Sequence, residues 1–182
     1  MTWKGTLLTL DLATVTGFAV GTPTGNLIHG EKRFGKAGGE RSRAYRNMRL
    51  WLDDVFAMYS PSMVTFESAA NPMIMQGKTN INTIKLLIGF TEHVEEYCYQ
   101  KVELREASVQ QVRASFLGSN RIKSAEAKLQ TKAKCRELGH EIEGDNAADA
   151  IALWYYQMSH LRPDLAHRTQ PLFYGKRPIP QP

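Results

Sequence analysis

The stretch TLLTLDLATVTGFAVG, from Thr6 to Gly21, decides the expected fold of this chain. Two apolar runs are joined by a short turn, and the first run carries a single acid, Asp11, at its end. Alternate side chains of a strand point to opposite faces, which puts Leu8 and Leu10 on one face and Asp11 on the other. An unpaired carboxylate at the end of a buried strand costs free energy or takes up a proton. Asp11 therefore either caps the following turn or belongs to a polar site.

Two later segments also place an acid at the end of a buried element. Ser62–Glu67, SMVTFE, is a short apolar run that ends in its acid, and Asp145–Trp154, DNAADAIALW, starts a helix with acids along one face. Within that helix Asp145 and Asp149 are four residues apart, so they share a face. The alanines around them are small, so the helix can lie close to a sheet.

If this helix crosses the ends of the two strands, Asp11, Glu67 and Asp149 converge. Three neighbouring carboxylates cannot all stay ionised without a counter-charge, and an all-oxygen ligand set selects a hard cation such as Mg²⁺ or Mn²⁺. Two such ions about 3.5–4 Å apart can activate a water and stabilise the leaving oxygen of a phosphodiester. The alternative is local, with Asp145 as the helix N-cap and Asp149 as a first-turn acid favoured by the helix dipole.

Length and composition indicate one globular domain. The 182 residues are 42% hydrophobic and 23% charged, and no apolar run reaches the ~18 residues of a membrane span. The N-terminus lacks the apolar core of a signal peptide. Cys98 and Cys135 lie in helical patterns and are expected to be reduced thiols of a cytoplasmic protein. The domain is expected to span residues 1–161, followed by a basic, proline-rich tail at 162–182 that is extended or disordered.

Positive charge is concentrated in three segments. The net charge is +5 and the pI about 9.2. Residues 31–49 hold seven Lys or Arg against two Glu, residues 121–136 hold six against one Glu, and the tail from residue 162 holds four against one Asp. Such clusters favour a polyanion such as nucleic acid, although solvated, solubilising faces would have the same composition.

The order of apolar periodicity and turn signals predicts an α/β protein with a mixed sheet. A hairpin over residues 3–21 turns near Ala13, and Gly17 allows another backbone to approach closely. Further strands are predicted at 26–34, 63–67 and 101–105, and helices at 41–59, 80–100, 108–117, 123–138 and 145–161. Glycine-rich phosphate loops and paired-cysteine zinc motifs are missing, and the five histidines lie without ligand spacing.

The sequence resembles the RuvC family of Holliday-junction resolvases, within the ribonuclease H-like superfamily. The matching segments follow the family's order over about residues 6–158. They are LDLATVTGFAV, VTFES, NTIKLLIGFTEHVEEYCYQKVELREASVQQVRASFLG, AEAKLQ and AADAIAL. The resemblance implies a mixed five-stranded sheet flanked by helices. It also implies a homodimer that binds a four-way DNA junction and nicks two strands with two Mg²⁺ or Mn²⁺ ions.

By this resemblance Asp11, Glu67 and Asp149 match three of the family's four carboxylates. The fourth position falls on Asn146. Either the preceding Asp145 or the amide oxygen of Asn146 would then complete the metal site, and Asp145 is the preferred choice.

The resemblance also implies which residues contact DNA. Lys128 matches a family lysine near the scissile phosphate, where a cation can stabilise developing charge; a surface lysine is the alternative. The loop with Met73 and Met75 lies where the family carries an apolar wedge that enters the junction, although both side chains could equally pack under the loop. The 80–100 helix matches the family's dimer-forming helix. The predicted DNA contacts are Arg43, Arg46, Met73, Met75, Lys78, Arg121, Lys123 and Lys128, with a solvated face as the alternative for the first two.

The first motif departs from the family pattern, because Asp11-Leu12-Ala13 stands where Asp-Pro-Gly is usual. This variant resembles the phage and prophage branch, so a cut-site preference does not carry over. The expected function is a metal-dependent, structure-selective endonuclease that resolves Holliday junctions or related branched DNA. The alternatives are a nuclease of structured RNA and a non-catalytic junction-binding protein. An ATP-binding protein of the actin and sugar-kinase group would need more than 182 residues.

Overall fold

A five-stranded mixed sheet forms the centre of the computed structural model, which describes residues 2–36, 39–68 and 81–168. The strand order is β3-β2-β1-β4-β5. The pairs β1–β2 and β2–β3 are antiparallel, whereas β1–β4 and β4–β5 are parallel. The strands are β1 (Leu7–Asp11), β2 (Val15–Gly21), β3 (Ile28–Arg33), β4 (Met63–Glu67) and β5 (Glu103–Ala107).

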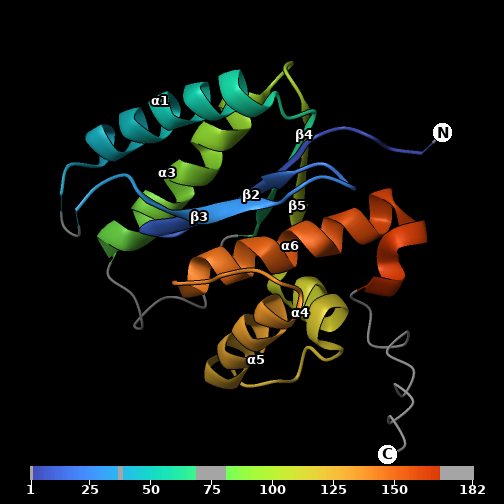
Figure 1. Ribbon diagram of the computed structural model, residues 1–182. Coiled ribbons are helices and arrows are strands. Elements are labelled where there is room, and N and C mark those ends of the chain that lie inside the picture. Colours follow the sequence, from blue (N-terminus) through green and yellow to red (C-terminus); the bar gives the residue numbers. More distant parts are fainter. Residues whose placement is uncertain (1, 37–38, 69–80, 169–182) are drawn as a thin grey trace, which may run out of the picture.

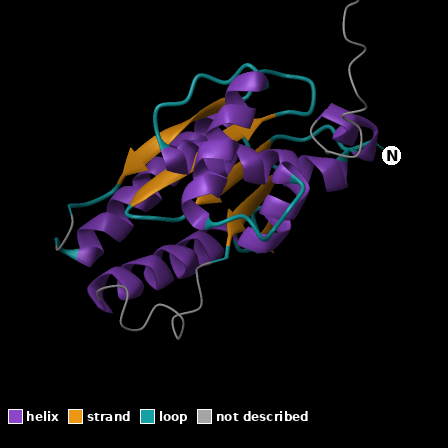
Figure 2. Ribbon diagram, turned by 90° about the horizontal axis from the view of Figure 1, so that it is seen from below, coloured by secondary structure: helices purple, strands orange, loops and turns teal. Residues whose placement is uncertain are grey.

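Helices cover both faces of this sheet (Figure 1). One face is covered by α1 and α3, while α6 crosses the other face and lies between the sheet and the pair α4 and α5. Seen from below, helices lie across the strands of the sheet (Figure 2). The helices are α1 (Arg41–Tyr59), α3 (Ile81–Cys98), α4 (Val109–Leu117), α5 (Ser124–Glu137), α6 (Asp145–Leu161) and the 3-10 helix η1 (Pro163–Arg168). Among the helices of the described residues, none is long and apolar enough to cross a bilayer.

Alternation along β1 divides the core as the sequence predicts. Leu8 and Leu10 are fully buried in the layer with α1 and α3, and Leu7 is fully buried in the layer with α6. Cys98 and Cys135 are free and buried, one in each layer. Burial raises the pKa of both thiols to about 12, so both stay protonated. Both cysteines lie in the core, as predicted, and their reduced state stays a prediction.

The fifth strand begins two residues later than the sequence predicts, at residue 103 instead of 101. The preceding backbone is used by the end of α3. The N–H groups of Lys101 and Val102 both bond to the carbonyl of Cys98, at 2.9 and 3.2 Å. These donors are therefore not free for a strand ladder.

The prediction of an extended or disordered chain from residue 162 is wrong for residues 163–168, which form η1. Pro163 is the first residue of this helix, a position whose N–H has no partner within the helix, so proline loses no hydrogen bond there. The Arg162 guanidinium binds both carboxylate oxygens of Asp164 and reaches the carbonyl of Trp3. The remainder of the predicted tail, residues 169–182, lies outside the described residues.

Helix α6 rests directly on the sheet, as the alanine-rich sequence predicts. The hydroxyl of Thr9 on β1 donates to the carbonyl of Ala150 at 2.8 Å. Gly17 on β2 lies against the helix backbone, because a Cβ there would come within 1.8 Å of the Asn146 carbonyl oxygen. Only a glycine allows this contact, which confirms the predicted close approach at Gly17.

We expect Gly17→Ala to lower the free energy of unfolding by about 3 kcal/mol, because a methyl group that meets backbone cannot be accommodated by a side-chain rotation. The measurement is urea unfolding followed by circular dichroism. Gly30→Ala on β3 is the matched control. Its methyl group would meet the Phe18 ring at 3.2 Å, and we expect a change within about 1 kcal/mol. Equal losses in the two variants would contradict the close contact.

Candidate active site

The acids singled out by the sequence lie at the ends of two neighbouring strands and at the start of α6. Asp11 is the last residue of β1, and Glu67 is the last residue of β4. The two strands are parallel and paired, so both acids lie at the same end of the sheet, where these strands end. Asp149 directly precedes Ala150, whose carbonyl accepts the bond from Thr9 on β1. The fold thus brings three carboxylates to one end of the sheet.

The pKa values of these carboxyl groups show that they interact. Burial, together with the charge of Asp149, raises the pKa of Asp11 to about 7. Burial, together with the charges of Asp11 and Asp149, raises the pKa of Glu67 to about 8. The pKa of Asp149 is raised to about 6, mainly by burial. Apolar surroundings and neighbouring negative charge both disfavour the ionised form of a carboxyl group.

Two basic side chains oppose this effect. Lys128 on α5 lowers the pKa of Asp11 and of Asp149, and Arg113 on α4 lowers the pKa of Glu67 and of Asp149. Both come from the helices that pack outside α6. The candidate site is therefore acidic between β1, β4 and α6, and basic towards α4 and α5.

The chemistry of this donor set suits a hard divalent cation. All three acids offer oxygen ligands, and the charge of Asp149 raises the pKa of both Asp11 and Glu67. A cation would neutralise this negative charge. Within residues 2–36, 39–68 and 81–168, no three His, Cys, Asp or Glu side chains are already close enough to hold a metal ion. The side chains would therefore have to turn towards an ion on binding.

Asp145, the residue preferred for the fourth ligand, is engaged by two lysines of α5. Its carboxylate lies 3.3 Å from Nζ of Lys128 and 2.9 Å from Nζ of Lys132. The bond from Lys132 is the main cause of its lowered pKa. Asp145 is also not the N-cap of α6, because Gly144 holds that position and gives no side-chain bond. Its role as a metal ligand stays a prediction.

Glu31 on β3 is a member of this region that sequence reasoning missed. Its Oε1 accepts the backbone N–H groups of Asn146 at 3.0 Å and Ala147 at 3.3 Å. Its charge also raises the pKa of Asp11. A capping side chain normally comes from the residue before the helix, whereas this one comes from 115 positions upstream. Local sequence therefore carries no signal for it.

Arg113 was missed for a different reason. It lies in the middle of α4 without a charged neighbour in its own helix, and its guanidinium also donates to the Ser124 hydroxyl at 3.4 Å. Only the packing of α4 beside α6 brings it near Glu67 and Asp149. Nothing in the local sequence distinguishes Arg113 from the other arginines of the chain.

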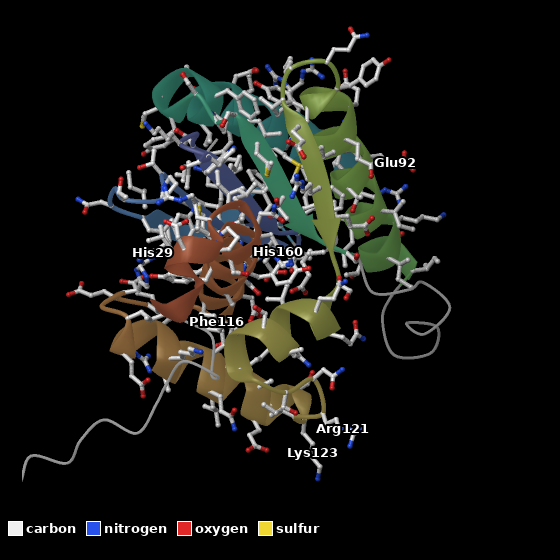
Figure 3. All side chains as sticks on the ribbon, turned by 90° about the vertical axis from the view of Figure 1, so that its right-hand side faces the viewer. His29, Glu92, Phe116, Arg121, Lys123 and His160 are labelled. Atoms are coloured by element: carbon white, nitrogen blue, oxygen red, sulfur yellow. The ribbon has the colours of Figure 1, made fainter. Side chains whose placement is uncertain are left out.

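The residues predicted to contact DNA are spread over separate surfaces. Arg43 and Arg46 are exposed on α1, on the face of the sheet opposite α6. Arg121 and Lys123 project into solvent between α4 and α5 (Figure 3). Lys128 is the member of this group that reaches the acids. Met73, Met75 and Lys78 lie outside the described residues.

Comparisons with known proteins show the fold. No protein-family model matches the sequence, and no curated protein matches it. Among solved structures, T. thermophilus RuvC in complex with a Holliday junction substrate superposes with a TM-score of 0.66 at 14% identity, covering 88% of this chain and 96% of that chain.

Two further structures agree with this result. A second structure of Thermus thermophilus RuvC gives a TM-score of 0.60 at 14% identity, with coverage of 88% of this chain and 96% of that chain. The yeast mitochondrial Holliday junction resolvase Ydc2 gives 0.52 at 11% identity, with coverage of 92% and 85%. The predicted fold, a ribonuclease H-like mixed sheet flanked by helices, is confirmed.

The raised pKa values predict how stability depends on pH in the absence of metal. Between about pH 4 and 8 the folded state holds more protons on Asp11, Glu67 and Asp149 than the unfolded state does, because their folded pKa values are about 7, 8 and 6. Stability then falls as the pH rises through this window. Asp11→Asn removes one of these groups and its repulsion of Glu67. We expect it to unfold at a higher temperature than the natural chain at pH 8, by about 2–4 °C for each kcal/mol of repulsion that the substitution removes.

This prediction is checked by thermal unfolding with a chelator at pH 5, 6, 7 and 8. The gap between the variant and the natural chain should widen with pH. Adding Mg²⁺ at pH 8 should stabilise the natural chain and leave Asp11→Asn nearly unchanged. A gap that is constant from pH 5 to 8 would show that Asp11 does not titrate in this range.

Proposed function

We propose that this chain is a metal-dependent, structure-selective endonuclease that resolves Holliday junctions or related branched DNA. The observation that carries the proposal is that Asp11, Glu67 and Asp149 lie at one end of a ribonuclease H-like sheet, each with a raised pKa. Two proteins of the same fold support the choice of substrate. One is a RuvC described in complex with a Holliday junction, and the other is a mitochondrial Holliday junction resolvase.

Asp11, Glu67 and Asp149 would hold two Mg²⁺ or Mn²⁺ ions, which when bound supply an activated water and stabilise the leaving oxygen of a phosphodiester. The three carboxyl groups must lose their protons to bind, so cation affinity should increase between about pH 6 and 8. Burial keeps bulk water away from these groups and strengthens their interaction with positive charge. The completion of the second ion's ligand set by Asp145 or Asn146 is part of the proposal.

Lys128 is proposed to bind the scissile phosphate. Its ammonium is close enough to Asp11 and Asp149 to lower their pKa values, and it is half-exposed. A phosphate that bridges this lysine and the carboxylate site would have its negative charge compensated from two sides. Arg121 and Lys123, exposed next to α5, would extend the same positive surface along a DNA arm.

We also propose a homodimer that pairs through α3. Ile81 and Ile88 on this helix are 60% and 37% exposed. Ile88 borders an open groove that α1 and α3 form together. Two such helices from two copies would cover these side chains and set two active sites against two strands of a junction. The buried thiols of Cys98 and Cys135 suit the reducing cytoplasm, which is the proposed compartment.

The proposed chemistry predicts that Asp11→Asn abolishes nicking of a synthetic four-way junction in Mn²⁺ while leaving junction binding unchanged. The amide at position 11 removes one negative charge from the ligand set and so weakens cation binding, whereas its nearly identical shape keeps the surface intact. The measurements are strand-cleavage assays and gel-shift binding without metal. Asp54→Asn, an exposed acid on α1 far from the site, is the matched control and should cut at the natural rate.

Two results would change this conclusion. Cleavage by Asp11→Asn at the natural rate would exclude the carboxylate mechanism. A natural chain that binds junctions without nicking them would instead be a junction-binding protein. Including a structured RNA as a second substrate separates a DNA resolvase from an RNA nuclease.

The proposed dimer predicts that Ile88→Glu converts the protein to monomers, because a carboxylate buried in an apolar interface loses its hydration without a partner. Size-exclusion chromatography with light scattering measures the mass directly. Leu129→Glu is the matched control, since Leu129 is 71% exposed on α5, away from α3, and this variant should remain dimeric. If both variants and the natural chain have the same mass, α3 is not the dimer contact.

A further inference from the structure

Three residues stand side by side across the antiparallel half of the sheet. Asp11 on β1 is paired with Gly17 on β2, and Gly17 is paired with Glu31 on β3. Directly opposite residues of neighbouring strands point to the same face. Asp11 and Glu31 therefore face α6 from either side of a glycine that offers no side chain. The space above Gly17 is filled by the backbone of α6 at Asn146.

The Glu31 carboxylate is hydrogen-bonded to the first turn of α6. Its Oε1 accepts the N–H groups of Asn146 and Ala147, which have no partner within the helix. Room for it depends on Gly144, because a Cβ there would lie 1.8 Å from Oε1 and 2.4 Å from Oε2. The backbone of Gly144 has a φ of −109°, which any residue can adopt. Space for Glu31, and not backbone conformation, is what requires glycine here.

Asp149 lies between two anchors of α6 on the sheet. One anchor is the pair of bonds from Glu31 to residues 146 and 147, and the other is the bond from Thr9 to Ala150. The first turn of a helix frays most readily, because its N–H groups lack helical partners. With both anchors present, the backbone that carries Asp149 is held in place beside β1.

We propose that Glu31 is the positioning residue of the carboxylate site, and that it fixes the first turn of α6, and Asp149 with it, through two hydrogen bonds. The role does not require Glu31 to touch the cation. The role has two consequences, and only the second rests on the proposed function: the site loses cation affinity when the first turn of α6 is no longer held by Glu31. The first consequence, the order of residues 146–150, belongs to the metal-free protein.

The first experiment measures backbone amide hydrogen exchange at residues 146–150 in the metal-free protein. Glu31→Ala removes the acceptor and should accelerate exchange there by about tenfold or more. Glu31→Gln keeps an acceptor oxygen at the same position and should stay near the natural rate. Gly144→Ala displaces the carboxylate while leaving its charge in the protein, and should behave like Glu31→Ala. Lys32→Ala, the next residue on β3 with its side chain towards the other face, is the control.

The second experiment measures Mn²⁺ affinity by electron paramagnetic resonance titration. We expect Glu31→Ala and Gly144→Ala to bind Mn²⁺ about 10–100-fold more weakly, as is usual when a residue that orients a metal ligand is lost. Glu31→Gln should stay within a few-fold of the natural chain. Far-UV circular dichroism checks that each variant is folded, and Gly144→Ala provides the test if Glu31→Ala fails to fold.

The outcomes separate the two proposals. Natural exchange rates in Glu31→Ala and Gly144→Ala would overturn the positioning role, whatever the Mn²⁺ affinity. An equal loss in Glu31→Gln and Glu31→Ala would also overturn it, because charge and not the hydrogen bonds would then be responsible. A natural chain that binds no Mn²⁺ would refute the metal site of the proposed function, while the exchange rates would still decide whether Glu31 holds α6.

Discussion

The contact between α6 and the strand surface at Gly17 is the constraint on which the candidate site depends. Because the helix backbone touches β2 with no side chain between them, the distance from α6 to the sheet is set by backbone atoms alone. Thr9 then fixes the helix along its axis by bonding to Ala150. A larger residue at position 17 would lift the helix and take Asp149 away from Asp11 and Glu67.

The same close packing creates an electrostatic problem that the rest of the fold does not remove. Asp11, Glu67 and Asp149 are partly buried between β1, β4 and α6. Lost hydration and neighbouring charge raise their pKa values to about 7, 8 and 6. Purely structural sites rarely keep several acids in this condition, because apolar side chains of similar size would be more stable. Groups with such strongly raised pKa values in one place are characteristic of functional sites. The free energy stored in this repulsion is released when positive charge binds.

Much of this arrangement could be predicted from the sequence, because the residue pattern within a single strand or helix indicates which face packs against a neighbour. The alternation of LLTLD, Gly17 in VTGFAVG and the alanines after Asp145 each reflect a contact that a strand or helix makes with a neighbouring element. The role of Glu31 was not readable, because it depends on the register of three strands and on Gly144, more than a hundred residues away. The start of β5 was misjudged because the last bonds of α3 compete for the same backbone donors.

The ion pairs of Asp145 show how the basic side of the site could respond to a phosphate. Asp145 has a lowered pKa, in contrast to Asp11, Glu67 and Asp149, so it remains ionised and holds two lysines at once. Its shorter bond is to Lys132, at 2.9 Å, and its longer one to Lys128, at 3.3 Å. If Lys128 turned towards a phosphate, Asp145 would still be paired with Lys132 and no charge would be left uncompensated. Lys128 is therefore the cation of this cluster whose reorientation disturbs the folded protein least, and it is also the one already close to Asp11 and Asp149.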